Sequence, residues 1–253
     1  MTVLWGWLAV AALMTGLWAR QLKTRNATSV DAFWALSIGL LVCFYALAGD
    51  GDPAVRALVA AVNGVWSFRL AWHLFRHRVR KETEEDGRYK AMREHWGGRA
   101  PRNFFFVYQL QAAVALLFSL PPKAAMEAAT LGPWAWAGVA VALVALGGEA
   151  LADAQLARWR ADPANRGKTC RAGLWRYSRH PNYFFEWVHW FAYVCIGGGA
   201  WLTWLGPAAM LLFLFRLTGI PWTEKQARKS REDYEEYQRT TSVFIPWFPK
   251  EDA

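Results

Sequence analysis

Long apolar runs separated by short polar segments are the dominant pattern of this 253-residue chain. An α-helix needs about 17 to 25 mostly apolar residues to cross the hydrocarbon layer of a membrane. Such runs occur at residues 2–19, 32–49, 54–74, 103–120, 129–152, 182–200 and 201–219. Only Gly197–Gly199 separate the last two, so these two runs could also form one broken or hairpinned element. The pattern therefore predicts an all-α, polytopic integral membrane protein with about seven transmembrane helices.

The composition agrees with a membrane protein and differs from that of an average soluble domain. Apolar residues make up 55% of the chain, and 17 residues are Trp, well above ordinary usage. The mean hydropathy is only +0.05, because a few very polar loops offset the apolar runs. No internal repeat or low-complexity linker divides the sequence. We therefore expect a single membrane domain over residues 1–253.

Positive charge is concentrated in four of the polar segments. Residues 20–30, 75–102, 153–181 and 220–253 contain 25 of the 29 Lys and Arg residues. These segments follow the first, third, fifth and seventh predicted helices, so all four face the same compartment. Because Lys and Arg are enriched in cytoplasmic loops, we expect the amino terminus outside and the carboxyl terminus in the cytoplasm. The same distribution accounts for the net charge of +9, and no nucleic-acid partner is expected.

One basic segment, residues 153–186, leads directly into the sixth predicted helix. Pro181 suits the first turn of that helix, whose free N–H groups and positive dipole end attract anions. The sequence thus predicts a site for a phosphate or diphosphate. The alternative is that the basic residues simply border the cytoplasmic interface of the membrane. These residues are Arg158, Arg160, Arg166, Lys168, Arg171, Arg176 and Arg179.

Polar residues continue from this segment into the sixth predicted helix. Asn182, Glu186 and His189 are spaced by four and three residues, so they lie on one helix face. Polar groups at membrane depth normally face the protein interior and a ligand or partner. We therefore expect this face to line a binding site.

The carboxyl-terminal stretch contributes Arg216, Glu224, Tyr234 and Tyr237. Arg216 and Glu224 would lie about 12 Å apart along a continuous helix, too far to pair with each other. We expect each of them to meet the basic segment instead. The alternative is a structural ion pair and an amphipathic surface helix.

Two other kinds of site are not supported by the sequence. It contains no G-x-G-x-x-G or Walker-type loop, so a Rossmann or P-loop nucleotide site is not expected. His73 and His77 lie one helical turn apart, a spacing that could ligate a haem or a metal. No matching second pair of ligands is present in the sequence, so we expect no metal site.

Two longer stretches of the second half of the chain carry a further signal. They are GLWRYSRHPNYFFEW at residues 173–187 and EKQARKSREDYEEYQRTTSVFIPW at residues 224–247. Together they resemble the carboxyl-terminal half of the steroid 5-alpha-reductase family. The likeness covers residues 150–250, extends more loosely to RNATSVDAFW at residues 25–34, and is nearest to bacterial members. The wider membrane superfamily also includes sterol reductases and isoprenylcysteine carboxyl methyltransferases, which share the R-H-P-x-Y pattern and the late Glu and Tyr residues.

The resemblance implies an NADPH-dependent reduction of a C=C bond conjugated to a ketone, in a steroid-like or other lipid substrate within the membrane. It implies that residues 1–149 form the substrate side and residues 150–253 the cofactor-binding half. The family's cofactor positions match Asp153, Arg160, Asn182 and Glu186. Charge and location add Arg171, Arg176, Tyr177, Arg179, His180, Tyr183, Arg216, Glu224, Tyr234 and Tyr237 as further cofactor-binding candidates.

The reaction also requires an acid near the substrate carbonyl. In the steroid enzymes, the amino-terminal half carries characteristic Gln-Glu and Tyr residues. This sequence has no plain counterpart of them, so we look for the acid among other residues. Asp31, at the start of the second predicted helix, is the best counterpart, and His73 is the second candidate donor. The role requires a protonated Asp31, which burial in a membrane cavity favours. The alternatives are that Asp31 caps its helix or pairs with Arg69.

Two other functions remain open. A methyltransferase of the isoprenylcysteine type, using S-adenosylmethionine, shares the R-H-P-x-Y pattern and Glu224. The basic residues before the sixth helix favour a cofactor with several phosphate groups. S-adenosylmethionine has no phosphate group. The other alternative is a non-catalytic lipid-binding membrane protein. For the chain as a whole we expect membrane lipids and an apolar small molecule as partners, no protein partner, and a multi-pass location in a bacterial inner membrane.

Overall fold

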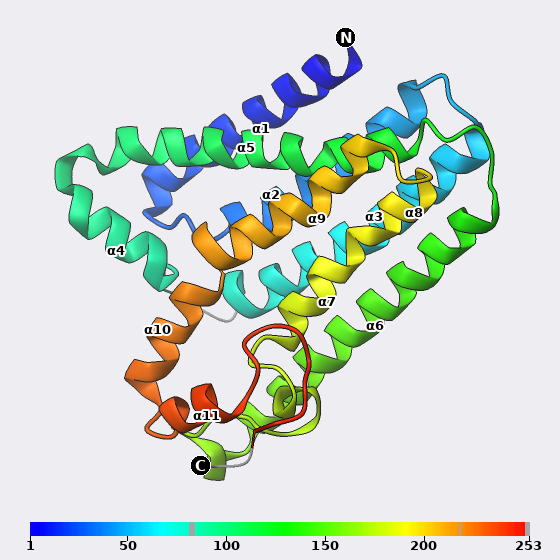
Figure 1. Cartoon of the computed structure of the whole chain (residues 1–253). Coiled ribbons are helices and arrows are strands. Elements are labelled where there is room, and N and C mark those ends of the chain that lie inside the picture. Colours follow the sequence, from blue (N-terminus) through cyan, green and yellow to red (C-terminus); the bar gives the residue numbers. More distant parts are fainter. Residues whose placement is uncertain (81–83, 218, 251–253) are drawn as a thin grey trace. The chain divides into compact units, whose positions relative to one another are not determined.

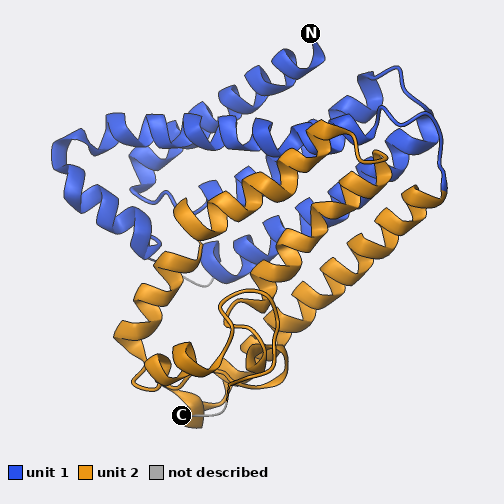
Figure 2. Cartoon of the chain, viewed as in Figure 1, with its two compact units in different colours: residues 1–132 blue, residues 133–253 orange. Residues whose placement is uncertain are grey.

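The computed structural model describes residues 1–80, 84–217 and 219–250, and every regular element in these ranges is a helix (Figure 1). The chain divides into two compact units, Met1–Gly132 and Pro133–Ala253 (Figure 2). The functional division predicted from the sequence lies at residue 149 instead. The fifth predicted helix therefore belongs almost entirely to the second unit.

Helices α2 and α5 make the main packing contacts of the first unit. Helix α2 contacts both α3 and α5, and α1 contacts α5 and α2. The described elements are α1 (Thr2–Thr24), α2 (Val30–Ala48), α3 (Pro53–Leu74), the π-helical turn η1 (Phe75–Val79), α4 (Gly87–Trp96), the 3₁₀ turn η2 (Gly97–Arg99) and α5 (Ala100–Ala125).

Small side chains and buried hydroxyl groups join these helices. Ser67 Oγ on α3 accepts a hydrogen bond from Gly39 N at 3.1 Å and donates one to Ala35 O at 2.6 Å, both on α2. Tyr45 on α2 shares a hydrogen bond of 3.2 Å with Ser119 on α5. Without a hydrophobic force between helices in lipid, close backbone approach and hydrogen bonds of this kind hold a bundle together.

The second unit begins with the long helix α6 and ends in the segment that carries most candidate site residues. Helix α6 contacts both α7 and α8. The described elements are α6 (Pro133–Ala161), η3 (Pro163–Asn165), η4 (Gly173–Arg176), α7 (Pro181–His189), α8 (Phe191–Ile196), η5 (Trp201–Trp204), α9 (Leu205–Leu212), the π-helical turn η6 (Phe213–Leu217), α10 (Ile220–Ser230) and α11 (Tyr234–Thr240).

Within the described residues, six helices are long and apolar enough to span a membrane. They are Thr2–Thr24, Val30–Ala48, Pro53–Val79, Gly87–Ala125, Pro133–Ala161 and Trp201–Ser230. The predicted fold class, an all-α protein with several membrane-spanning helices, is confirmed.

The run at residues 182–200, predicted as the sixth membrane span, is not among these six helices. It forms α7 and α8, which meet at Trp190, where the backbone N–H bonds to Trp187 O only three residues back. At 1.5 Å per residue, residues 181–196 rise about 24 Å, less than the roughly 30 Å of the hydrocarbon layer. This segment is therefore too short to cross the hydrocarbon layer as a straight helix, because it ends at the glycines that follow Ile196.

The glycines at 197–199 turn the chain back. Gly198 and Gly199 have φ values of 60° and 78°, a region that glycine adopts without steric cost. Helix α7 then contacts α9, and α8 contacts η5, so the two limbs lie side by side as a hairpin (Figure 1). This is the hairpinned arrangement that the spacing of the two apolar runs allowed.

Glycines also let α6 approach this hairpin closely. A Cβ built at Gly148 would overlap the ring of Phe185 on α7, and one built at Gly138 would come within 2.7 Å of Ala192 O on α8. By contrast, a Cβ at Gly147 meets no atom of the described residues within 4 Å. The α6–α7 contact therefore depends on the absence of a side chain at residue 148.

We predict that Gly148→Ala destabilises the protein while Gly147→Ala, its neighbour on the same helix, does not. The added methyl group must displace the Phe185 ring, and overpacking of this kind costs about 1–3 kcal/mol. Thermal melting of the two variants in detergent measures the difference. Equal melting temperatures would show that α6 and α7 are not in close contact at this position.

Candidate functional site

A stripe of polar side chains runs along one face of α6. Glu149, Asp153 and Arg160 are spaced by four and seven residues, so they lie on the same face. Glu149 is 6% exposed. From Glu149 to Arg160 the stripe extends about 16 Å along the helix axis.

The polar face predicted on the sixth helix is present on α7 and meets this stripe. Asn182 Nδ2 donates to Asp153 Oδ1 at 3.3 Å. Glu186 and His189, farther along α7, are 8% and 1% exposed, and His189 Nε2 lies 2.8 Å from the hydroxyl oxygen of Tyr193. Buried polar residues on two facing helices match the expectation that this face lines a site.

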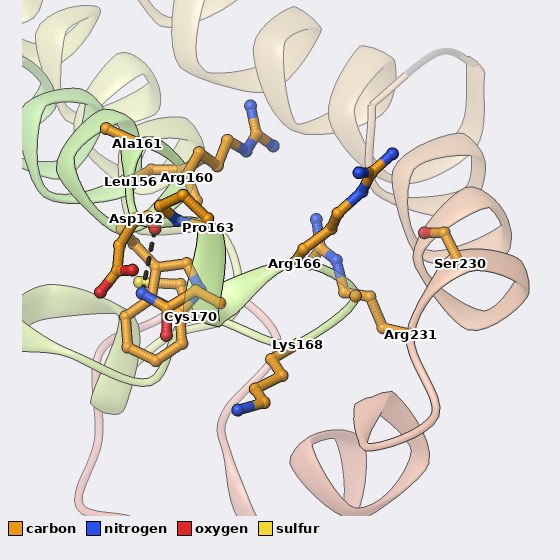
Figure 3. Close-up of a pocket in the computed structure, with 13 residues that line it drawn as sticks. Leu156, Arg160, Ala161, Asp162, Pro163, Arg166, Lys168, Cys170, Ser230 and Arg231 are labelled. Atoms are coloured by element: carbon orange, nitrogen blue, oxygen red, sulfur yellow. Dashed lines mark hydrogen bonds between the residues drawn. The ribbon is translucent and has the colours of Figure 1, made fainter.

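A cavity of about 490 Å³ opens at the end of α6. Its lining combines the last turn of α6, the loop that follows it, and the end of α10 (Figure 3). Four cationic side chains and one carboxylate, that of Asp162, line the cavity. In Figure 3 the guanidinium groups of three arginines point to the same side of the cavity, whereas the ammonium group of Lys168 points away from them. These arginines are Arg160, Arg166 and Arg231.

Arg179, predicted to bind phosphate, forms an ion pair with Glu224 of α10. Its Nε donates to Glu224 Oε1 at 2.7 Å, and the two side chains are only 11% and 12% exposed. Its Nη1 donates to Gln238 O at 2.9 Å and Thr241 O at 2.7 Å. Gln238 Nε2 completes the cluster with a bond of 2.7 Å to Glu224 Oε2. The cluster fixes α10 and α11 to the residue pair that precedes α7.

His180 packs against the same cluster. Its Nε2 lies 3.4 Å from Glu224 Oε1, and its ring stacks on Tyr183 at 5.4 Å and 6°. Burial lowers the pKa of His180 below its ordinary value, and although Glu224 acts in the opposite direction, the net shift is downward. Burial thus favours the neutral imidazole, which has a donor at one nitrogen and an acceptor at the other.

Arg171 is also engaged within the protein. Both of its terminal nitrogens bond to Glu236 at 3.0 Å, and Nη2 donates to Asp233 O at 3.1 Å. The hydrogen bond and charge of Glu236 raise the pKa of Arg171. Asp233 in turn accepts from the Thr169 hydroxyl at 2.6 Å. This arrangement ties the loop after α6 to the start of α11.

The two predicted tyrosines of α11 are buried at 3% and 2% exposure. Tyr237 donates to Ser178 O at 3.1 Å and also to Trp175 O. Burial raises the pKa of Tyr234 to about 12. In this structure Tyr237 supports the backbone that leads into α7.

The remaining predicted cofactor residues are more open. Arg176 in η4 and Arg216 in η6 are exposed, and Tyr177 contacts Phe248 with ring centroids 6.0 Å apart. Arg216 and Glu224 lie on separate elements, η6 and α10. Of the predicted set, the structure therefore brings Asp153 and Asn182 into contact, joins Arg179, His180 and Glu224, and places Arg160 in the cavity.

Sequence reasoning did not identify Ser230 and Arg231 as lining residues, whereas it named Arg166 and Lys168 among the basic residues of the predicted anion site. Arg231 lies in the basic carboxyl-terminal segment, but no motif connects it with Arg160. The only sequence signal that marks Arg231 is its charge within the basic carboxyl-terminal segment.

In the first unit, Asp31 lies in the first turn of α2 at the centre of an ion cluster. Its carboxylate accepts from Arg88 at 2.6 Å, from Arg78 at 3.2 Å and from the Tyr89 hydroxyl at 2.5 Å. Helix α2 begins after Ser29, and no side-chain cap bond forms there. Asp31 thus connects α2 with η1 and α4.

Asp86 extends the cluster around Asp31. It accepts from Arg88 Nε at 3.0 Å. Burial alone would raise its pKa, but the hydrogen bonds and charge of Arg88, together with Arg78, lower it below its ordinary value. Two carboxylates and two guanidinium groups therefore neutralise each other at this end of the unit.

His73, the second candidate donor, lies near the end of α3. Its ring centroid is 4.4 Å from that of His77, and His77 Nδ1 lies 3.0 Å from His73 O. In the described part of the chain, no three His, Cys, Asp or Glu residues form a group that could hold a metal ion.

These features define a polytopic, all-helical membrane protein with a basic cavity beside a buried polar helix face. The chain belongs to the family described as Protein of unknown function (DUF1295), which matches residues 17–241 and is of the steroid 5-alpha-reductase-like type. An uncharacterized protein of Schizosaccharomyces pombe is 25% identical over 268 residues, covering 91% of this chain and 75% of that protein. No solved structure matches the chain.

We predict that Asp31→Asn lowers stability by about 1–3 kcal/mol, because it removes one of the two carboxylates that Arg78 and Arg88 share, Asp86 being the other. Asp50→Asn, a change at an exposed carboxylate of the same unit, should have little effect. Thermal melts in detergent measure both. Unchanged stability together with a roughly 10²-fold loss of turnover would instead identify Asp31 as a catalytic donor.

We also predict that Glu224→Gln destabilises the second unit by about 3 kcal/mol or more, because it removes the charge that compensates buried Arg179. Glu235 on α11 is exposed, so Glu235→Gln is the matched control and should change stability by less than about 1 kcal/mol. Denaturation of each purified variant provides the comparison. Equal stability of the two variants would contradict a structural role for the Arg179–Glu224 pair.

Proposed function

We propose that the protein is an NADPH-dependent membrane reductase that transfers a hydride to the C=C bond of an enone in an apolar substrate, steroid-like or another lipid. The observation that carries this proposal is the basic cavity at the end of α6. Its volume of about 490 Å³ lies within the ordinary range for small-molecule sites. Its excess of positive charge suits a ligand with several phosphate groups.

The residues around the cavity fit such a cofactor. Arg160 lies on the α6 stripe that leads back to Asp153 and Asn182, which are in contact at 3.3 Å. Phosphate groups on Arg160 would therefore place the rest of an extended dinucleotide along the polar faces of α6 and α7, toward Glu186. Arg171 and Arg179 already form ion pairs with carboxylates of the protein. We therefore assign them a structural role in the site and no contact with the cofactor.

When bound, NADPH supplies the hydride for the β-carbon of the enone. The α-carbon gains a proton, and the products are the saturated ketone and NADP⁺. The protein must also polarise the substrate carbonyl with a donor as negative charge develops on its oxygen. Asp31 and His73 remain the candidates for that role. The cluster around Asp31 favours a structural function for its carboxylate and leaves His73 as the next donor to test.

Family membership supports the membrane location and the reductase-like class. We extend this to a multi-pass protein of a bacterial inner membrane, with membrane lipids and an apolar small molecule as its partners. The structure offers no observation that favours the methyltransferase, whose cofactor has no phosphate for the basic cavity.

We predict that purified protein binds NADPH and not S-adenosylmethionine, and that it oxidises bound NADPH when an enone is added. Arg160→Ala should weaken NADPH binding by about tenfold or more. Arg228 is an exposed arginine of α10 outside the cavity lining, so Arg228→Ala is the control. Isothermal titration and single-turnover absorbance provide the measurements. Binding of S-adenosylmethionine alone, or of neither cofactor, would refute the reductase proposal.

A further inference from the structure

A closed loop, residues 240–250, follows the last turn of α11 (red in Figure 1). Lys250 N donates to Thr240 O at 2.8 Å, so the two ends of the loop meet. Compact surface loops whose ends lie close together frequently carry a function of their own.

Two backbone hydrogen bonds attach this loop to the residues that precede α7. The N–H group of Arg179 donates to Ser242 O at 2.8 Å, and that of Trp247 donates to Tyr177 O at 2.9 Å. The loop backbone is therefore fixed relative to the start of α7.

One aromatic side chain of the loop points inward. Phe244 is 4% exposed, and its ring contacts Phe184 and Trp187 on α7 at 5.8 and 5.6 Å. It also contacts Phe215 in η6 at 5.2 Å. These three partners belong to the two apolar runs that form the hairpin. Phe244 thus fixes the loop at the end of the hairpin that adjoins the basic segments.

Three other large apolar side chains of the same loop remain uncovered. Ile245, Trp247 and Phe248 are 58%, 70% and 76% exposed. Because the loop backbone is held at both ends and at α7, it presents these side chains together as one patch. Clustered exposed apolar groups of this kind mark an interaction surface.

The patch lies next to apolar surface of the hairpin. Leu212 and Leu217 of the α9–η6 limb are also exposed, and so are Trp201 and Trp204 at the opposite end of that limb. Tryptophan is enriched at both interfaces of a membrane, where its ring lies at the level of the headgroups. Trp247, at the basic end, therefore complements the two tryptophans at the glycine end.

Exposed cations accompany the patch. One ends the loop, and the other two are chain neighbours of residues that contact it. They are Lys250, Arg176 and Arg216. Long basic side chains near the ends of membrane segments extend their charges to the headgroups, and anionic lipids attract them. The apolar and the charged parts together match the boundary of a phospholipid bilayer.

We infer that the loop of residues 240–250 is a lipid-interface anchor. Ile245, Trp247 and Phe248 insert between the headgroups and the acyl chains on the basic side of the membrane, while Phe244 joins the loop to the hairpin. The anchor connects the membrane surface to the residues that precede α7 and so fixes the depth at which α7 begins. This inference does not depend on the proposed reaction.

The test is photochemical crosslinking of the full-length protein in vesicles of phosphatidylethanolamine and phosphatidylglycerol. The photoreactive amino acid p-benzoylphenylalanine is incorporated in place of Trp247 or Phe248 and, as the matched control, in place of Glu235, an exposed residue of α11. Mass spectrometry of the intact protein measures lipid adducts. Because interfacial groups lie about 5–10 Å into the boundary of headgroups and acyl chains, adducts at positions 247 and 248 should exceed those at 235 by about tenfold or more.

Two results would overturn the inference. One is an equal amount of lipid adduct at positions 247, 248 and 235, which would place the loop in water. The other is crosslinking of positions 247 and 248 to protein in place of lipid, either within the chain or to a second copy. Melting temperatures within a few degrees of the native protein show that the substituted proteins are folded.

Discussion

The ion pair between Arg179 and Glu224 is the contact on which the geometry of the candidate site depends. It joins the residues that precede α7 to α10, and Gln238 and Thr241 extend it to α11. Both side chains are largely buried, so each charge would be costly without the other. Helix α10 ends at Ser230, directly before Arg231, and both residues line the cavity. The pair therefore holds in place the helix that leads to these two lining residues.

The distinction between paired and unpaired arginines separates structural roles from binding roles. By charge alone, Arg160, Arg171 and Arg179 are equivalent, and all three lie in one basic segment. In the folded chain, carboxylates neutralise the last two, whereas Arg160 lines a cavity in which four cationic side chains are accompanied by the single carboxylate of Asp162. A basic cluster near a membrane therefore indicates an anion-binding site only when the carboxylates that pair with its members are known. The same reasoning applies to Asp31, whose partners Arg78 and Arg88 make it part of an ion cluster.

Polar side chains on α6 and α7 extend the candidate site from the basic cavity along these two helices. Glu149 on α6 and Glu186 on α7 are both buried, and exposed side chains of α6 include the apolar residues Leu143 and Leu151. Burial of carboxyl groups is unfavourable unless other groups compensate for the lost water. Asp153 and Asn182 supply one such contact, and the absence of a side chain at Gly148 lets the two helices approach closely enough to make it.

Patterns in the sequence were enough to predict the helical class, the approximate position of the membrane runs, the basic segment, and the polar face of α7. Apolar run length and helical spacing are local properties, so they can be read without a fold. The family resemblance likewise rests on local motifs, and the match over residues 17–241 bears it out. Only the tertiary structure decided that α7 and α8 form one limb of a hairpin, that Arg179 binds Glu224, and that Arg231 lines a cavity with Arg160. Those outcomes depend on contacts between segments far apart in the chain, and no residue type or spacing specifies which of many charges will meet.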